Sequence, residues 1–238
     1  MIELAGICDN PKIGAARKLL AADTFLRIPV GRYALMSDDP ALTRPAIDIL
    51  SGIRPPASGR VTVRGLCSWP IGRAGFIRGK VNGYEIVALV SRLYNLSHTL
   101  CTEIVREMMT EPSALGDRIE HWPSAVRHEF SHAIALLPPF DIYAIEGTFP
   151  FIQNRFTRLW KDLFEKRING RTLILATTRV NEIRAYCDRA IVCRRGCIEI
   201  EDDLEAAIAK YPLRLVNISP TESDKDIVEE RDENEDIF

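Results

Sequence analysis

The sequence lacks the features by which a membrane protein or a disulfide-stabilised secreted protein is recognised. None of its apolar runs approaches the ~20 residues that a membrane-spanning helix needs. Its first residues contain neither a basic segment nor a long apolar run, so we expect no signal peptide. The six cysteines include no CxxC pair, which argues against a zinc site and predicts buried free thiols in a reducing cytoplasm.

A strong charge bias is also lacking. The chain carries 31 basic and 33 acidic side chains, with no basic helix and no aromatic-rich basic strip. Nucleic acid is therefore not an expected partner. The charge is nevertheless uneven, because residues 222–238 hold nine acids and only two bases. We predict one folded domain over residues 1–210, followed by an acidic and disordered tail over residues 211–238.

The most informative stretch that is present runs from Tyr33 to Gly52 and reads YALMSDDPALTRPAIDILSG. A short apolar strand enters a polar turn, and a helix is predicted to begin near Thr43–Pro45. Thr43 can cap that helix, and a proline in the first turn costs little. Strand, tight turn and helix form the frame in which P-loop proteins hold nucleotide phosphates.

The chemistry of a phosphate-binding turn is missing from this frame. Such a turn needs glycines whose N–H groups converge on the anion, a lysine for the terminal phosphates and a Ser/Thr for Mg²⁺. Ala34–Gly52 resembles, without a gap, the Walker A segment of ATP-binding cassette (ABC) transporter subunits. We expect the equivalent loop to be inactive, because its proline has no N–H and its two aspartates add negative charge. The positions aligned with the phosphate loop are Ser37, Asp38, Asp39, Pro40, Ala41, Leu42, Thr43 and Arg44.

The run from Ser68 to Tyr94 indicates which group of ABC subunits the chain resembles. It begins SWPIG and ends RLY, and it is similar to ATP-binding subunits that export capsular and O-antigen polysaccharides. The Q-loop glutamine of that family falls on Arg78, whose cationic side chain cannot coordinate a metal. Two interpretations of the retained motif stay open. It forms a docking surface with exposed Arg73 and Lys80, or its Trp69 and Pro70 pack a join between subdomains.

The same resemblance places the remaining motif positions. It implies that a serine of the signature loop can still donate one hydrogen bond, and that the Walker B position can accept a metal through water. It also implies that the catalytic glutamate and the switch histidine have been replaced. These positions are Ser124 for the signature loop, Glu146 for Walker B, Gly147 for the glutamate and Thr178 for the histidine.

His128–His132 reads HEFSH and matches the HExxH pattern of zinc proteases. Histidines at positions i and i+4 share one helix face, and this face lies opposite the apolar stripe. The extended zinc-protease pattern fails downstream. We therefore favour an exposed helix and keep a zinc hydrolase as a minor alternative.

The resemblance spans roughly Thr24–Lys210. It implies an α/β fold of the ABC P-loop type: a twisted, mainly parallel sheet, flanking helices, an antiparallel β portion and a helical subdomain at about residues 83–137. We expect a pseudo-ATPase of polysaccharide export with no catalytic residues and no metal, to which ATP and Mg²⁺ bind weakly if at all. Expected partners are a membrane subunit of the exporter or its ATPase subunit, in a homo- or heterodimer, at the cytoplasmic face of the plasma membrane. The alternative is a functional ATP-binding subunit that works with a partner ATPase.

Overall fold

A computed structural model describes residues 1–9, 20–73, 77, 79–147, 149–150, 152–194 and 196–211. Arg78 and residues 212–238 of the predicted tail lie outside this described part. Tyr211 falls within the predicted tail, but its side chain is buried against the main hydrophobic core.

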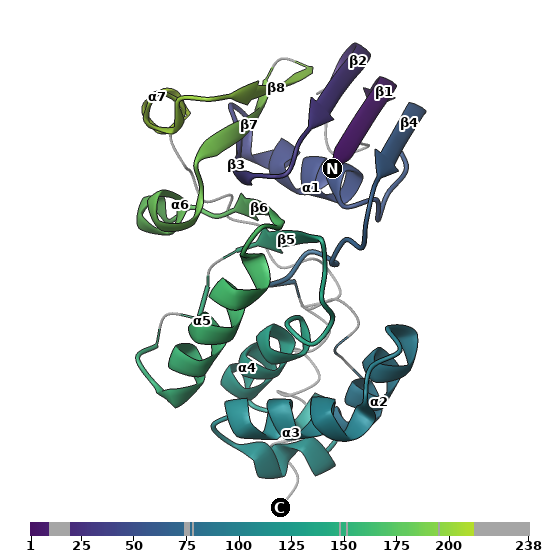
Figure 1. Cartoon of the computed structure of the whole chain (residues 1–238), viewed down its shortest axis with the longest axis vertical. Coiled ribbons are helices and arrows are strands. Elements are labelled where there is room, and N and C mark those ends of the chain that lie inside the picture. The colour runs from purple at the N-terminus through teal and green to yellow at the C-terminus, as the bar shows by residue number, and fades with distance from the viewer. Residues whose placement is uncertain are drawn as a thin grey trace, which may run out of the picture.

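The centre of the molecule is a five-stranded sheet with the order β5-β6-β3-β7-β8. The first four strands of this order are parallel, and β8 is antiparallel to β7. β3, β5 and β6 are almost wholly buried, as expected for parallel strands that are covered on both faces. The predicted mainly parallel sheet is thus confirmed (Figure 1). The strands are β3 (Arg32–Ser37), β5 (Ile142–Glu146), β6 (Thr172–Ala176), β7 (Arg189–Arg194) and β8 (Cys197–Glu201).

A second sheet of three antiparallel strands has the order β2-β1-β4. Its strands are β1 (Ile2–Asp9), β2 (Leu20–Ile28) and β4 (Ser58–Val63). This sheet is the antiparallel β portion that the resemblance implied. β1 is the central strand, because it pairs with β2 on one side and with β4, more than fifty residues later, on the other.

Helix α1 (Thr43–Leu50) packs between the two sheets (Figure 1). Its apolar side chains join those of β1 and one face of β3, where Tyr33 and Leu35 point. Ala34 and Met36 point to the other face and contribute to a larger core that includes the remaining helices. The alternation of side chains along β3 therefore divides the interior into two apolar clusters.

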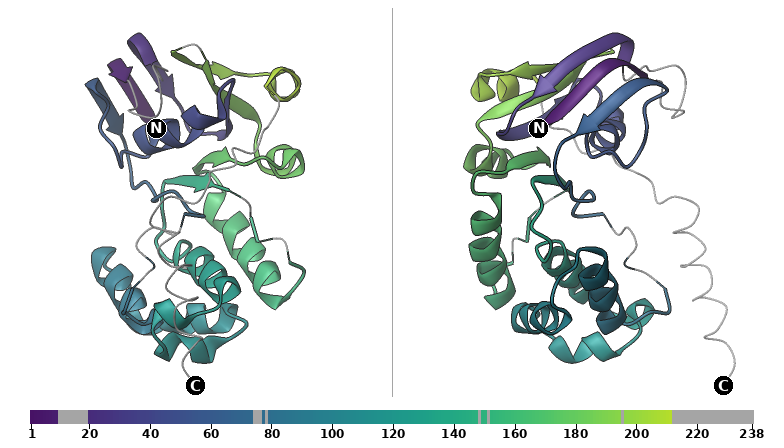
Figure 2. Two further views of the ribbon diagram at one scale, coloured as in Figure 1. Left: turned by 180° about the vertical axis from the view of Figure 1, so that it is seen from behind. Right: turned by 45° about the vertical axis from the view of Figure 1, so that its right-hand side comes forward.

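Three helices form a group at one end of the molecule, below the sheets in Figures 1 and 2. They are α2 (Gly83–Leu93), α3 (His98–Met108) and α4 (Ser124–Ile134), with 3₁₀ turns at Pro112–Gly116 and Ile119–His121. Asn82 and Glu85 cap α2 reciprocally. Gly83 allows close packing here, since a Cβ at this position would lie 2.6 Å from Leu115. α5 (Arg155–Ile168), α6 (Val180–Tyr186) and α7 (Leu204–Lys210) complete the chain's helices within the described part.

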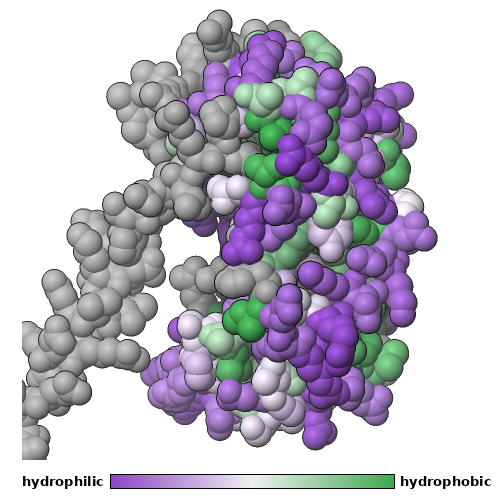
Figure 3. Space-filling view, turned by 90° about the vertical axis from the view of Figure 1, so that its left-hand side faces the viewer, coloured by the Kyte–Doolittle hydropathy of each residue, from purple (hydrophilic) through white to green (hydrophobic). Residues whose placement is uncertain are grey.

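Within the described residues, no helix combines the length and the apolar character that crossing a membrane requires. On the face shown in Figure 3, hydrophobic residues occur as several separate spots among hydrophilic ones. No disulfide joins any of the six cysteines. The prediction of buried thiols holds for Cys101, Cys187 and Cys193, but it is wrong for Cys197, which is exposed. Burial raises the pKa of Cys67, Cys187 and Cys193 to about 12, so these thiols stay protonated at neutral pH.

Candidate functional site

Three of the predicted site positions lie at one edge of the parallel sheet. Ser37 ends β3 and Glu146 ends β5, while Thr178 follows β6 by two residues. β6 lies between the other two strands, and Glu146 is in register with Ala176. Ligands of α/β proteins bind outside the carboxyl ends of parallel strands. This edge is therefore where a nucleotide would be expected.

The loop that follows β3 is closed by its own hydrogen bonds. The Ser37 hydroxyl donates to the Cys193 carbonyl oxygen at 2.8 Å and accepts from the Asp39 N–H at 3.1 Å. The Asp39 carboxylate accepts from the Ala41 N–H at 3.2 Å, and the Asp39 carbonyl accepts from the Leu42 N–H at 2.9 Å. Pro40–Leu42 consequently forms a 3₁₀ turn, which the sequence did not predict.

No backbone N–H of residues 38–43 remains free for a phosphate. The Asp38 N–H donates to Cys193 and the Thr43 N–H donates to Pro40, so each position from 38 to 43 either donates within the protein or is the proline. A phosphate-binding nest needs several N–H groups that converge on open space. The sequence predicted an inactive loop from its residue types, and the geometry gives a physical reason for that expectation.

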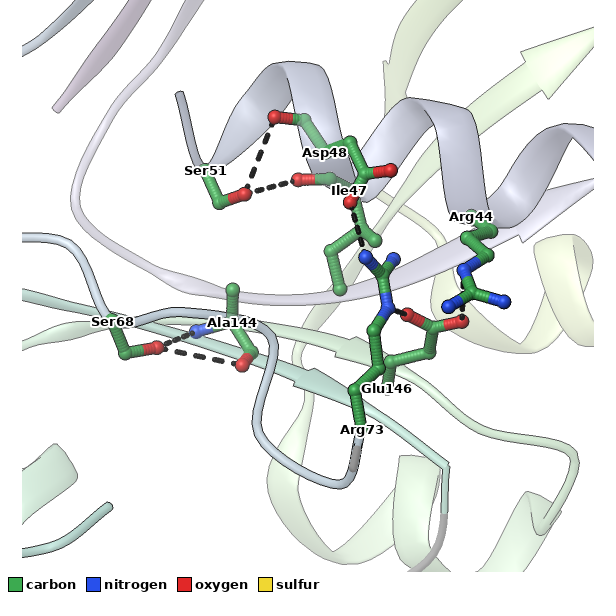
Figure 4. A network of polar contacts seen from close by, with 8 residues as sticks. All are labelled: Arg44, Ile47, Asp48, Ser51, Ser68, Arg73, Ala144 and Glu146. Atoms are coloured by element: carbon green, nitrogen blue, oxygen red, sulfur yellow. Dashed lines mark hydrogen bonds and ion pairs between the residues drawn. The ribbon is translucent and has the colours of Figure 1, made fainter. Parts of the chain in front are cut away.

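Arg73 lies between helix α1 and the end of β5 (Figure 4). Its Nε donates to Glu146 Oε2, and its Nη1 donates to Asp48 Oδ1 at 2.5 Å. Arg44 Nε lies 3.9 Å from the other oxygen of Glu146. The two arginines and two carboxylates form a network with no net charge, which links α1, the 66–73 segment and the end of β5. The side chain of Arg73 is only 18% exposed.

The network revises two expectations. Arg73 was taken as an exposed surface residue, but it is largely enclosed by its ion pairs. Glu146 was assigned the capacity to hold a metal through water, whereas both of its oxygens face arginines. Within the described residues, no cluster of three or more His, Cys, Asp or Glu side chains can hold a metal ion. Arg73 Nη2 is buried without a hydrogen-bond partner there, so the guanidinium also retains one unused donor.

The backbone of the 66–73 segment runs beside β5 and aims Arg73 at the site. The Ile71 N–H donates to Ala144, and the Glu146 N–H donates to Ile71, at 2.9 and 2.8 Å. The Ser68 hydroxyl accepts from the Ala144 N–H at 2.9 Å. Gly72 has a φ of +100°, and a Cβ there would lie 2.2 Å from the Glu146 carbonyl oxygen. Only glycine permits this approach.

Trp69 belongs to an aromatic cluster at the join between the sheet and the helical group. Its ring centroid lies 5.5 Å from that of Phe140, in an edge-to-face arrangement, and 6.4 Å from that of Tyr94. Aromatic pairs at such distances contribute to packing. These ring contacts support the interpretation that the SWPIG motif packs the join between subdomains. Lys80, which belongs to the alternative docking interpretation, is exposed as expected.

Ser124 lies apart from this network, at the first position of α4. Its side chain is exposed, and the helix begins after Pro123 without a side-chain cap. The first N–H groups of an α-helix have no partner within the helix. The N-terminal end of α4 therefore has N–H groups without a side-chain cap, whereas the N–H groups of the phosphate loop are bonded within the protein.

Thr178 and Gly147 complete the predicted positions. Gly147 has a φ of +113°, and its N–H donates to the Ala176 carbonyl at 2.8 Å. Thr178 is half-buried beside them. Neither offers a carboxylate or an imidazole. The described edge thus lacks a general base at the two positions where the resemblance implies one.

The HEFSH segment lies on α4, but it does not form an exposed histidine pair. His132 is fully buried, and its Nδ1 lies 2.9 Å from the His128 carbonyl oxygen. The sequence pattern missed this because Trp160 of α5 covers that side of the helix and donates to the His132 carbonyl. Glu129 accepts hydrogen bonds from Thr110 and Asn154. The zinc alternative therefore loses its geometric support.

The fold just described is that of the ATP-binding domain of ABC transporters. The structure superimposes on an ATP-binding subunit of an ABC transporter with a TM-score of 0.65 and 15% identity, over 96% of this chain and 98% of the other. It also superimposes on a dimeric structure of the bacterial ABC transporter cassette MJ0796, with a TM-score of 0.66 and 16% identity over 85% of this chain and 98% of that one. Identities this low show the fold alone.

No family model matches the chain. The similar sequences nevertheless indicate a narrower group of proteins than the similar structures do. The chain is 24% identical to the ATP-binding protein BexA of Haemophilus influenzae, over 89% of this chain and 98% of that protein. It is 26% identical to the capsule polysaccharide export ATP-binding protein CtrD of Neisseria meningitidis, over 69% and 76%. It is 25% identical to the polysialic acid transport ATP-binding protein KpsT of Escherichia coli, over 90% and 97%. The chain is a homologue of ABC ATP-binding proteins of polysaccharide export, as its motifs predicted.

Proposed function

We propose that this chain is a non-hydrolysing ABC subunit that serves a polysaccharide exporter in a structural or regulatory role. The observation that carries the proposal is the closed edge of the sheet. The backbone N–H groups of residues 38–43 are used internally, and both carboxylate oxygens of Glu146, the Walker B position, face arginines. A nucleotide would need to break several internal bonds before it formed any of its own.

Calorimetric titration of the full chain with Mg²⁺-ATP tests this function. We expect a dissociation constant weaker than about 1 mM, which corresponds to roughly −4 kcal/mol. Phosphate release should stay at background and be the same in Glu146→Gln, because Glu146 is bound to arginines. Micromolar affinity together with hydrolysis that Glu146→Gln abolishes would overturn the proposal.

The partner of this subunit is the membrane component of an exporter, reached from the inner face of the plasma membrane. Support comes from the helical group, where α2 and the start of α3 carry exposed apolar side chains. Leu89, Leu93 and Leu100 are 46%, 68% and 55% exposed, and Tyr84 is 37% exposed. Leu89 and Leu93 are four residues apart on α2 and so share one face of the helix, and exposed apolar side chains on one face are typical of a protein interaction surface.

Docking is tested by purification from native membranes. Leu93→Glu should reduce co-purification with exporter subunits at least about tenfold, because it puts a charge into an apolar contact. Ile53→Glu provides a matched control, since Ile53 is 53% exposed and follows α1, outside the helical group. Lys80→Glu tests the docking role of the SWPIG stretch separately. Equal recovery of Leu93→Glu and the control would contradict this docking face.

A second function is favoured by the open start of α4. In this role the chain would form a heterodimer and present Ser124 and the first N–H groups of α4 to a partner ATPase whose own phosphate loop is intact. The exposed and uncapped helix end supports it. Ser124→Asp should then lower ATPase activity in the isolated heterodimer, whereas the non-hydrolysing function alone predicts no change.

A further inference from the structure

A cavity of about 330 Å³ lies between α4 and the segment that leads into α5. One wall is the first part of α4, with Ala125 and His128, and the other includes Ile152 and Phe156. None of the phosphate-loop positions and none of the four residues of the Arg73 network line it, whereas Ser124, the signature-loop position, does. The cavity is therefore distinct from the edge of the sheet where a nucleotide was expected.

The walls of the cavity are mainly apolar and firmly held. Phe156 is 1% exposed and belongs to the main core, so it cannot turn out of the cavity without disturbing that core. Ile152, in contrast, is 60% exposed at the rim and gains little burial from the protein itself. Ligand sites typically combine a fixed apolar wall with exposed apolar atoms that a ligand can cover.

The polar groups around the cavity favour an uncharged ligand. No lysine or arginine occurs among the described residues that line it. Glu129 is committed to three hydrogen bonds from Thr110 and Asn154, at 2.8–3.1 Å. Burial lowers the pKa of His128, so its imidazole is neutral at neutral pH and offers one hydrogen-bond acceptor. An anion would find no counter-charge here.

We propose that this cavity binds a small, uncharged aromatic compound whose single N–H or O–H group donates to His128. A cavity of about 150 Å³ holds a benzene ring in other proteins, so 330 Å³ is enough for a fused bicyclic ring. Such a ligand would touch both α4 and the segment before α5, which Glu129 and Asn154 already join at 3.1 Å. It would hold the helical group against the core. The proposal does not depend on the chain's own phosphate loop, although the cavity shares Ser124 with the heterodimer function proposed above.

Indole and its isostere indene, which lacks the N–H group, test this site in the full chain by ligand-observed NMR and calorimetry. For indole we expect a dissociation constant of about 0.1–1 mM, in line with a ligand of this size. Indene should bind roughly two- to tenfold more weakly, because it loses one neutral hydrogen bond. In His128→Phe the two compounds should bind equally.

Ala125→Trp fills the cavity and should weaken indole binding at least about tenfold. Ala206→Trp is the matched control, since Ala206 is an exposed alanine on helix α7. No indole binding at several millimolar, or equal binding by Ala125→Trp and the control, would overturn the proposal. Loss of self-association in Ala125→Trp without any indole binding by the wild type would instead identify the cavity as a socket for a protein side chain, and would equally overturn it.

Discussion

The phosphate-loop end of α1 and the first turn of α4 are two helix starts with opposite character. Before α1, each position from 38 to 43 is internally bonded or is proline, and Arg73 and Glu146 are tied together beside it. Before α4, Pro123 provides no cap and Ser124 is exposed. A resemblance to one family predicts both as parts of nucleotide sites. The comparison shows that the backbone N–H groups of the chain's own phosphate loop are used within the protein. The start of α4, in contrast, is exposed and has no side-chain cap.

The largest effect should come from Arg73→Ala. It removes the cation that binds both Asp48 and Glu146, and we expect the free energy of unfolding to fall by about 2–4 kcal/mol. Urea denaturation measures this change. Lys80→Ala is the control, because that side chain is exposed and should change stability by no more than about 0.5 kcal/mol. Equal midpoints for the two variants would show that the Arg73 network does not hold the edge closed.

The same variant should acquire a response to divalent cations. Asp48 and Glu146 are held by one guanidinium, so its removal leaves two neighbouring carboxylates with Arg44, 3.9 Å from Glu146, as the one remaining cation of the network. We expect millimolar Mn²⁺ to raise the melting temperature of Arg73→Ala and to leave the wild type unchanged. Asp48→Asn in the Arg73→Ala background should abolish the response. A response that survives this second change would locate the cation elsewhere.

A matched pair of serine variants sharpens the comparison directly. Ser37→Ala removes both the donor to Cys193 and the acceptor of the Asp39 N–H, so it should cost about 1–2 kcal/mol. Ser124→Ala removes an exposed hydroxyl and should stay within about 0.5 kcal/mol. Thermal unfolding of both proteins provides the measurement. If the two variants lose the same stability, the contrast between the closed and the open helix start is wrong.

The smallest expected effect concerns pH at the α4 end. Burial lowers the pKa of His128 from its ordinary 6.5, while Glu129 acts in the opposite direction and the His132 ring lies 4.2 Å away. The unfolded chain therefore binds this proton first, and stability is lost as the pH falls from about 6.5 through the lower folded pKa. Because His128 is partly exposed, we expect less than about 1 kcal/mol. His128→Gln should reduce the difference in stability between about pH 7.5 and 5.5, and an unchanged profile would assign it to other groups.

Much of the fold could be predicted, because the signals for it are local. The strand and helix around Tyr33–Gly52 follow from apolar patterning, and the motif resemblance orders the rest of the sheet. The central place of β1 could not be predicted, since it depends on pairing with β4 across more than fifty residues. The 3₁₀ turn at Pro40–Leu42 was missed because it depends on Asp39 bonding its own neighbours.

The sequence predicted which motif residues are replaced at the candidate site, but it did not predict that Arg73 binds Asp48 and Glu146 there. Replacement of glycine, lysine and glutamate can be read directly from the aligned positions. The role of Arg73 depends on contacts with Asp48 and Glu146, which are 25 and 73 residues away in the chain. Arg73 lies next to Gly72 in a recognisable motif, and nothing in that motif distinguishes an enclosed arginine from an exposed one. The burial of His132 was missed for the same reason, because Trp160 belongs to another helix.

The Arg73 network also bears on how such a protein can evolve. A variant that acquired the glycines and the lysine of a phosphate loop would still have Arg73 bound to Asp48 and Glu146. Losing Arg73 first would leave Asp48 and Glu146 unbalanced, so that step would be selected against before any nucleotide could bind. Under the proposed non-hydrolysing function, a sequence of single substitutions that rebuilds the phosphate loop would therefore pass through less stable proteins.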